Sequence, residues 1–91
     1  MNTLENEFNK YSIIVKNLKK TPEDDELLTL YGLYKQSIDG DCNINKPLFL
    51  NFKEKRKYNA WNDQVGLEKN KAMKYYVREV KILIKQYGIN E

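Results

Sequence analysis

The sequence predicts an all-α protein of four helices. Four segments carry apolar residues at intervals of three and four, the spacing that places side chains on one face of a helix. No segment alternates polar and apolar residues over enough positions to indicate a strand. The length of 91 residues fits one small core, so residues 1–91 are expected to form a single domain.

The first predicted helix covers about residues 4–18, and Thr3 can cap its start. Lysines near its end suit the negative end of the helix dipole. Its apolar stripe consists of Leu4, Phe8, Tyr11, Val15 and Leu18, widened by Ile13 and Ile14.

The second helix is expected to begin at Thr21-Pro22 and to continue to about Ser37. Threonine is a good N-cap, and proline is favoured at the first helical position. The acidic run 23–26 then fills the first turn, where the helix dipole favours negative charge. A carboxylate metal cluster is the weaker interpretation of this run.

Turn-forming residues from Ile38 to about Phe49 predict a long connection. The third helix is expected from about Leu50 to Asp63, with Phe52, Ala60 and Trp61 as its apolar residues. The fourth is expected from about residue 67 to Tyr87, where Gly88 supplies a stop. Its stripe is the cleanest in the chain and consists of Met73, Tyr76, Val77, Val80, Leu83, Ile84 and Tyr87.

The composition narrows the function. No apolar run approaches the roughly 20 residues that span a bilayer, and the N-terminus lacks the apolar segment of a secretory signal. Cys42 is the one cysteine and histidine is absent, which argues against an internal disulfide, a zinc site and histidine-dependent nucleophiles. No Gly-rich phosphate loop is present. We therefore expect a cytoplasmic protein that is not an enzyme and has no catalytic residues, metal or cofactor.

Tyr31, Tyr34 and Lys35 are the strongest candidates for a binding site. Residues three and four apart share a helical face, so two aromatic rings would lie beside an ammonium group. A lysine is seldom fully buried without a partner, so this patch is unlike a core face. Its chemistry suits a flat, anionic ligand. Lys53 and Lys57 also share a face, close to aromatic residues of the third helix.

Two other functions remain open on these features alone. A small nucleic-acid-binding module would use the basic run 53–57 on phosphates, although a net charge of +3 and a pI of about 8.9 are low for that role. A partner-binding bundle would instead use the tyrosine patch as an interface hot spot.

The order of motifs along the chain is distinctive. It runs Tyr31-x-x-Tyr34-Lys35-Gln36, Gly40-Asp41, Lys46-Pro47, Phe52-Lys53-x-Lys55-x-Lys57-Tyr58-x-Ala60-Trp61-Asn62, Ala72-Met73-Lys74-x-Tyr76 and Tyr87-Gly88-Ile89. From Phe8 to Ile89 the chain closely resembles the acyl-CoA-binding protein family.

This resemblance implies an up-down-down-up four-helix bundle with a long overhand loop between helices two and three. It implies non-catalytic binding of medium- to long-chain acyl-CoA thioesters, for intracellular transport and maintenance of the acyl-CoA pool. It also implies a monomer that makes transient contacts with acyl-CoA-using enzymes or membranes and binds no nucleic acid.

The resemblance further implies roles for individual residues. Tyr31 and Lys35 match residues that contact the 3′-phosphate of the nucleotide, and Tyr34 matches the aromatic residue that meets the adenine. Lys57 matches a phosphate-binding lysine. Ligand contacts are also implied for Tyr76, on the fourth helix, and for Lys16, on the first.

Two further residues are assigned from their own chemistry. Lys53 adds positive potential beside Lys57, and Leu28 is expected to line an apolar groove for the acyl tail. Each methylene removed from water contributes about 0.8 kcal/mol, so the tail can dominate affinity while the headgroup sets specificity.

Four positions depart from the family pattern. Tyr58 stands where tryptophan is common, and Thr21 stands where many members have lysine, which removes one phosphate contact. Arg56 replaces a small residue near the ligand, and Phe49 replaces a different apolar residue. These differences are expected to reshape the acyl groove more than the headgroup site, and they leave the preferred chain length open.

Overall fold

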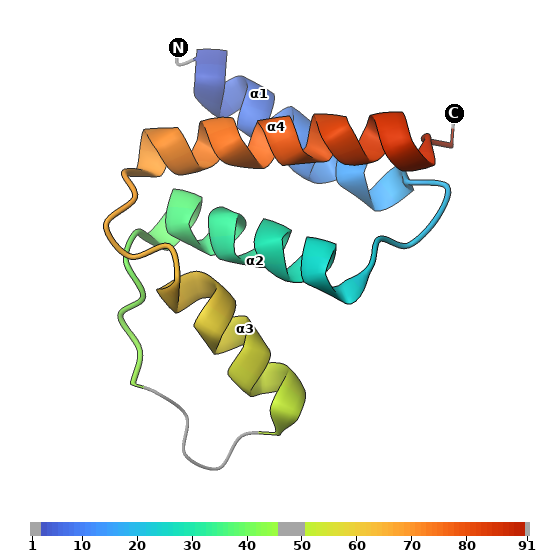
Figure 1. Cartoon of the computed structure of the whole chain (residues 1–91). Coiled ribbons are helices and arrows are strands. Elements are labelled where there is room, and N and C mark those ends of the chain that lie inside the picture. Colours follow the sequence, from blue (N-terminus) through green and yellow to red (C-terminus); the bar gives the residue numbers. More distant parts are fainter. Residues whose placement is uncertain (1–2, 46–50, 91) are drawn as a thin grey trace.

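The computed structural model describes residues 3–45 and 51–90. Its helices are α1 (Thr3–Ile14), α2 (Asp24–Asp39), α3 (Phe52–Asn62) and α4 (Lys69–Tyr87), and a short 3-10 turn, η1 (Val15–Asn17), extends α1 (Figure 1). Within these residues no strand forms, and the one β-type pairing is an isolated bridge between Leu18 and Ile89. The predicted all-α class is confirmed.

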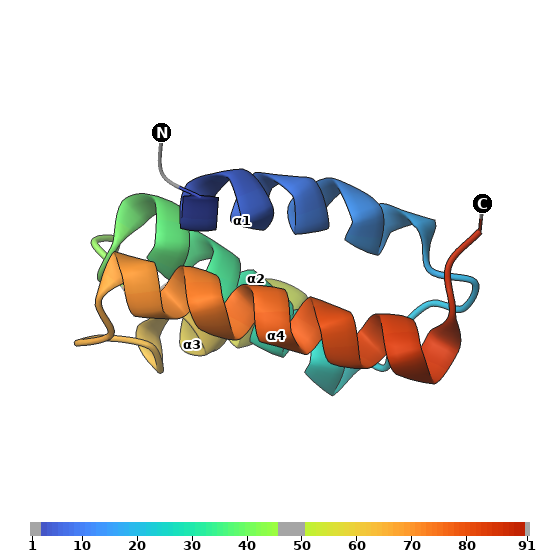
Figure 2. The same cartoon turned by 90° about the horizontal axis from the view of Figure 1, so that it is seen from above.

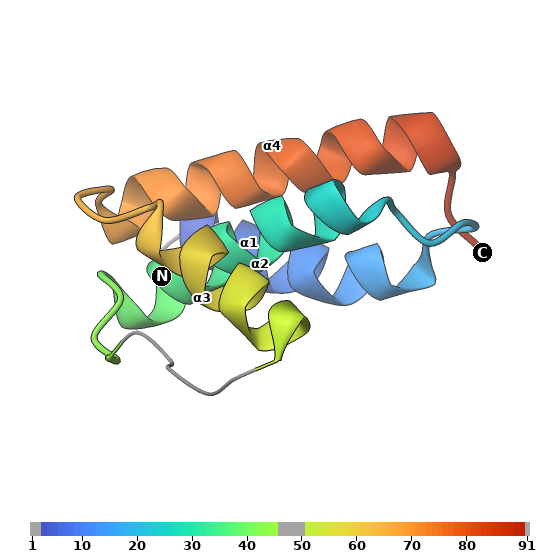
Figure 3. The same cartoon turned by 60° about the horizontal axis from the view of Figure 1, so that its bottom comes forward.

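The helices form an up-down-down-up bundle, as predicted. α1 and α4 run in one direction, and α2 and α3 run in the opposite direction (Figures 1 and 2). α2 lies between α4 and α3, while α1 packs against α4. Figure 3 shows α3 resting on α2, to which the long connection from residue 40 to residue 51 leads.

The core lies where α4 meets α1 and α2. The predicted stripe of α4 is confirmed, because all of its residues are buried in this core or packed against it. The most deeply buried apolar residues of the three helices are Phe8, Leu30, Leu33, Tyr76, Val77, Val80 and Leu83.

Two details of the first two helices were predicted wrongly. Ile13 does not widen the buried face of α1, since 66% of its surface is exposed. It lies five residues after the buried Phe8, which places it about 140° away around the helix. The start of α2 is also later than Thr21-Pro22. Glu23 is its N-cap, and the Glu26 carboxylate accepts a hydrogen bond from the Glu23 N–H at 2.9 Å, as in a capping box.

The C-terminal segment holds η1 in place. The Lys19 N–H donates to the Gly88 carbonyl at 2.9 Å, and the Asn90 N–H donates to the Asn17 carbonyl at 2.8 Å. These bonds join the segment that follows α4 to the end of η1. The position of Lys16, on η1, therefore depends on contacts with the opposite end of the chain.

A polar junction connects the end of α2 to the turn between α3 and α4. The buried Gln36 side chain donates from Nε2 to the Leu67 carbonyl at 2.7 Å and to Asp41 Oδ1 at 2.9 Å. The same Asp41 oxygen accepts a hydrogen bond from the Gly66 N–H at 2.9 Å. Trp61 of α3 adds a bond from Nε1 to the Gly40 carbonyl at 2.8 Å.

α2 and α3 also approach each other closely along their length. A Cβ atom at Gly32 would lie 2.3 Å from the Ala60 carbonyl oxygen, a distance that requires the backbone to move. Glycine at this position therefore permits the contact between the two helices. None of the described helices is both long enough and apolar enough to cross a membrane.

Gln36→Leu should destabilise the protein by about 1–3 kcal/mol, because it leaves a buried carbonyl group without its donor. Urea denaturation measures this change in the free energy of unfolding. Ser37→Ala is the matched control: Ser37 is equally buried, but its hydroxyl donates to the Leu33 carbonyl within its own helix. That substitution should cost much less. Equal losses in both variants would contradict the role of the junction.

Stability should also depend on the charge of Asp41. Hydrogen bonds from the Gly66 N–H and from Gln36 lower the pKa of Asp41 below its ordinary value of 3.8. A carboxyl group with a lower pKa in the folded state stabilises that state above its unfolded pKa, and this stabilisation is lost as the pH falls through the folded pKa. The difference in melting temperature between the native chain and Asp41→Asn should therefore shrink below about pH 3.8. A difference that stays constant with pH would contradict it.

Candidate functional site

A cavity of about 350 Å³ opens where α2 faces η1 and α4, and we call it the tyrosine cavity. It combines three phenol rings with one ammonium group, which suits a flat ring carrying negative charge. Its lining residues are Val15, Lys16, Pro22, Leu27, Leu30, Tyr31, Tyr34 and Tyr76.

Buried aromatic rings support this cavity from beneath. The Tyr34 ring stacks on Phe8 with centroids 5.6 Å apart, and Tyr76 meets Phe8 edge to face at 5.0 Å. Phe8 and Tyr76 are buried, whereas Tyr34 is more than a third exposed. Tyr34 therefore has a fixed base and a surface that a ligand ring can reach. Burial, followed by the nearby Tyr34, raises the pKa of Tyr76 to about 12, so its phenol stays protonated at neutral pH.

A second cavity, of about 610 Å³, lies between α2 and α3, and we call it the α2–α3 cavity. Two of its apolar side chains are unusually exposed, Phe52 at 75% and Leu27 at 41%. The two cavities adjoin, because Leu27 and Tyr31 line both. The lining residues of the α2–α3 cavity are Asp24, Leu27, Leu28, Tyr31, Phe52, Lys53, Arg56 and Lys57.

Lysines from two elements surround the boundary between these cavities. Lys57 of α3 places its Nζ atom 4.9 Å from the centroid of the Tyr31 ring, a cation–π contact between α3 and α2. Lys53 lies one turn earlier on α3, and Lys16 reaches the tyrosine cavity from η1. The boundary can therefore receive an anion from two sides.

Lys35 occupies a different position from the other predicted cations. It is not among the residues that line these two cavities, and its Nζ atom pairs with Asp39 Oδ2 at 2.5 Å. The ammonium group also lies 4.7 Å from the centroid of the Trp61 ring. The hydrogen bond to Asp39 is the main cause of the raised pKa of Lys35, and the tyrosines at 31 and 34 contribute to the same direction.

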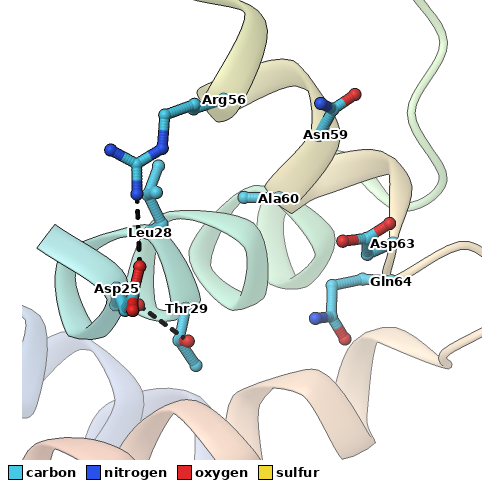
Figure 4. A pocket seen from close by; sticks show the side chains of 8 residues that line it. All are labelled: Asp25, Leu28, Thr29, Arg56, Asn59, Ala60, Asp63 and Gln64. Atoms are coloured by element: carbon cyan, nitrogen blue, oxygen red, sulfur yellow. Dashed lines mark hydrogen bonds and ion pairs between the residues drawn. The ribbon is translucent and has the colours of Figure 1, made fainter. Parts of the chain in front are cut away.

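A third cavity, of about 380 Å³, continues along α2 and α3 away from the tyrosines, and we call it the polar cavity. Figure 4 shows Arg56 at one end of this cavity and the side chains of Asp63 and Gln64 at the other. Leu28 and Arg56 line both the polar cavity and the α2–α3 cavity.

The structure brings seven of the eight predicted ligand-binding residues to adjoining cavities. Lys35 lies beside them, on its ion pair with Asp39. The tyrosine cavity takes Lys16, Tyr31, Tyr34 and Tyr76, and the α2–α3 cavity takes Tyr31 again with Leu28, Lys53 and Lys57. Within the described ranges, no group of three or more His, Cys, Asp or Glu side chains is placed to hold a metal ion.

Several lining residues were not predicted. Phe52 was expected to pack as an apolar residue of its helix, but it is largely exposed at the mouth of the α2–α3 cavity. Arg56 pairs with Asp24 and Asp25 of α2, a contact between positions 31 and 32 residues apart that helical spacing could not reveal. Spacing could have revealed the ion pair between Lys35 and Asp39, which are four residues apart. Phe49 lies outside the described residues.

Comparison with known proteins gives one consistent result. The family model described as "Acyl CoA binding protein" matches residues 5–80. A relative from a species of Hypsibius is 45% identical over 87 residues, which make up 96% of this chain and 98% of that one. An acyl-CoA-binding protein of Dictyostelium discoideum is 49% identical over 74 residues, or 81% of this chain and 88% of the relative.

A solved structure agrees with these sequence matches. The crystal structure of acyl-CoA-binding protein 2 of Oryza sativa superposes with a TM-score of 0.86 at 35% sequence identity, covering 91% of this chain and 92% of that chain. The similarity therefore extends over sequence and fold together, and it includes the helices that carry the adjoining cavities. On this evidence the chain belongs to the acyl-CoA-binding protein family.

Proposed function

We propose that this chain binds medium- to long-chain acyl-CoA thioesters at the two adjoining cavities and catalyses no reaction on them. The observation that carries the proposal is that a cavity rich in tyrosine directly meets a larger cavity with exposed apolar side chains, and that lysines lie where they meet. An acyl-CoA has the matching division: a flat, multiply charged nucleotide at one end and an apolar chain at the other.

The headgroup is assigned to the tyrosine cavity. The exposed face of Tyr34 would stack on the adenine, supported by Phe8 beneath it. Lys57, Lys53 and Lys16 would supply positive charge to the phosphates. Tyr31 and Lys35 are assigned to the 3′-phosphate, and Tyr76 would meet the ligand at the inner wall of the cavity.

The acyl tail is assigned to the α2–α3 cavity. Leu27, Leu28 and Phe52 offer it carbon surface, and a tail lying there would cover apolar side chains that are otherwise exposed to water. At about 0.8 kcal/mol for each buried methylene, even a few methylenes outweigh a single surface ion pair. The free thioester is therefore expected to bind much more tightly than coenzyme A.

The cellular role follows from binding without chemistry. We propose that residues 1–91 act as one acyl-CoA-binding domain, a cytoplasmic monomer that carries acyl-CoA and maintains its pool. Transient contacts with acyl-CoA-using enzymes or membranes would receive the ligand, and no nucleic acid or cofactor is required.

Titration calorimetry tests the proposed function with four ligands: palmitoyl-CoA, coenzyme A, palmitate and a DNA oligonucleotide. Palmitoyl-CoA should bind tightly, while coenzyme A and palmitate, each carrying half of the recognised chemistry, should bind far more weakly. Salt-sensitive binding of the oligonucleotide alone would favour a nucleic-acid-binding module. A folded chain that binds none of the four would favour a protein-binding bundle.

The ion pair of Lys35 yields a sharper prediction about the headgroup. A 3′-phosphate that uses Lys35 must compete with Asp39, so Asp39→Asn should tighten palmitoyl-CoA binding by about two- to fivefold, the range of a partly exposed ion pair. The thioester of 3′-dephospho-coenzyme A is the matched control ligand, whose affinity should not change. Equal gains for both thioesters would mean that Asp39 repels the ligand in general rather than occupying Lys35.

A further inference from the structure

Arg56 is held across the space between α2 and α3 by contacts on both helices. Its Nη2 atom lies 3.2 Å from Asp25 Oδ1, and its Nη1 atom lies 3.8 Å from Asp24 Oδ2. On its own helix the guanidinium group lies 5.4 Å from the centroid of the Phe52 ring. Figure 4 shows the side chain extending from α3 to Asp25 of α2, with Leu28 beside it.

Packing fixes this side chain more firmly than the ion pairs do. Asp24 and Asp25 are almost fully exposed, and such pairs contribute little to stability. The side chain of Arg56, by contrast, is only 32% exposed, so about two thirds of it lies against neighbouring atoms. Its bulk is therefore a permanent part of the wall, and the carboxylates direct where the guanidinium group points.

This side chain stands at the boundary between two cavities of different chemistry. Arg56 and Leu28 are the residues shared by the α2–α3 cavity and the polar cavity. On one side lie Leu27 and Phe52; on the other lie the polar groups of Thr29, Asn59, Asp63 and Gln64. An apolar chain passing this boundary would have to displace Arg56 and then remove water from polar groups, which costs free energy.

We propose that Arg56 forms the end wall of the tail-binding cavity and thereby determines the acyl chain length that this chain prefers. The proposal rests on the proposed function, because it assigns the α2–α3 cavity to the tail. Affinity should rise with each methylene until the tail meets Arg56. Additional carbons should then turn into solvent, and affinity should level off.

The experiment measures the affinity of the native chain and of Arg56→Ala for saturated acyl-CoA thioesters from 8 to about 20 carbons. A buried methylene at about 0.8 kcal/mol corresponds to about fourfold in affinity. The native chain should gain by about this factor per carbon and then reach a plateau. In Arg56→Ala the carbon surface of Leu28 and Ala60 becomes accessible, so affinity should continue to rise for a few carbons beyond that point.

Lys55→Ala is the matched control, because it also removes one positive charge from α3 while Lys55 is exposed and lines none of the three cavities. Its plateau should coincide with that of the native chain. Thermal melts and the affinity for coenzyme A without a tail should be unchanged in Arg56→Ala, which shows that its fold and headgroup site are intact.

The outcomes separate this inference from the proposed function. A plateau at the same length in the native chain and in Arg56→Ala, a native chain with no plateau, or an equal shift in Lys55→Ala would each overturn the role of Arg56 while leaving acyl-CoA binding established. If the folded native chain binds none of the thioesters, the proposed function fails, and the assignment of Arg56 fails with it.

Discussion

The buried amide of Gln36 joins three parts of the chain that are distant in sequence. It links the end of α2 to Asp41 at the start of the long connection and to Leu67 in the turn before α4. α3 packs mainly against α2, so its angle depends on the few contacts that hold its ends. The bond from Trp61 to the Gly40 carbonyl and the close approach at Gly32 complete this set. Because both larger cavities beside α3 are bounded by α2, their width follows from the same junction.

α2 divides its surface between stability and binding. Leu30, Leu33 and Gln36 face the interior, whereas Leu27, Tyr31 and Tyr34 line the cavities. Apolar surface on the second face remains partly exposed, an arrangement that stability alone does not favour. The buried face lets this cost be tolerated, because its contacts with α4 do not depend on whether a ligand is present. The helix that supports the core can thus also present the site.

The sequence was sufficient for the helices and for most lining residues, because both depend on short-range periodicity. The stripe of α4 predicted its buried face, and the spacing of Tyr31 and Tyr34 predicted their common cavity. Periodicity failed where the environment depends on a neighbouring helix. Phe52 looks like a core residue in its own segment, but α3 presents it to solvent. The pairing of Arg56 with Asp24 and Asp25 depends on the angle between two helices, which no local pattern encodes.

The cations of the site differ in what already holds them, and this difference matters for selectivity. Lys57 lies over the face of Tyr31, and an aromatic ring attracts an ammonium group without cancelling its charge. A phosphate can therefore approach Lys57 while that contact persists. Lys35 and Arg56 are instead paired with carboxylates of α2, so an anion must compete for them. Lys57 is thus suited to general attraction of the headgroup, Lys35 to recognition of a particular phosphate that can displace Asp39, and Arg56 to a structural role at the far end of the tail cavity.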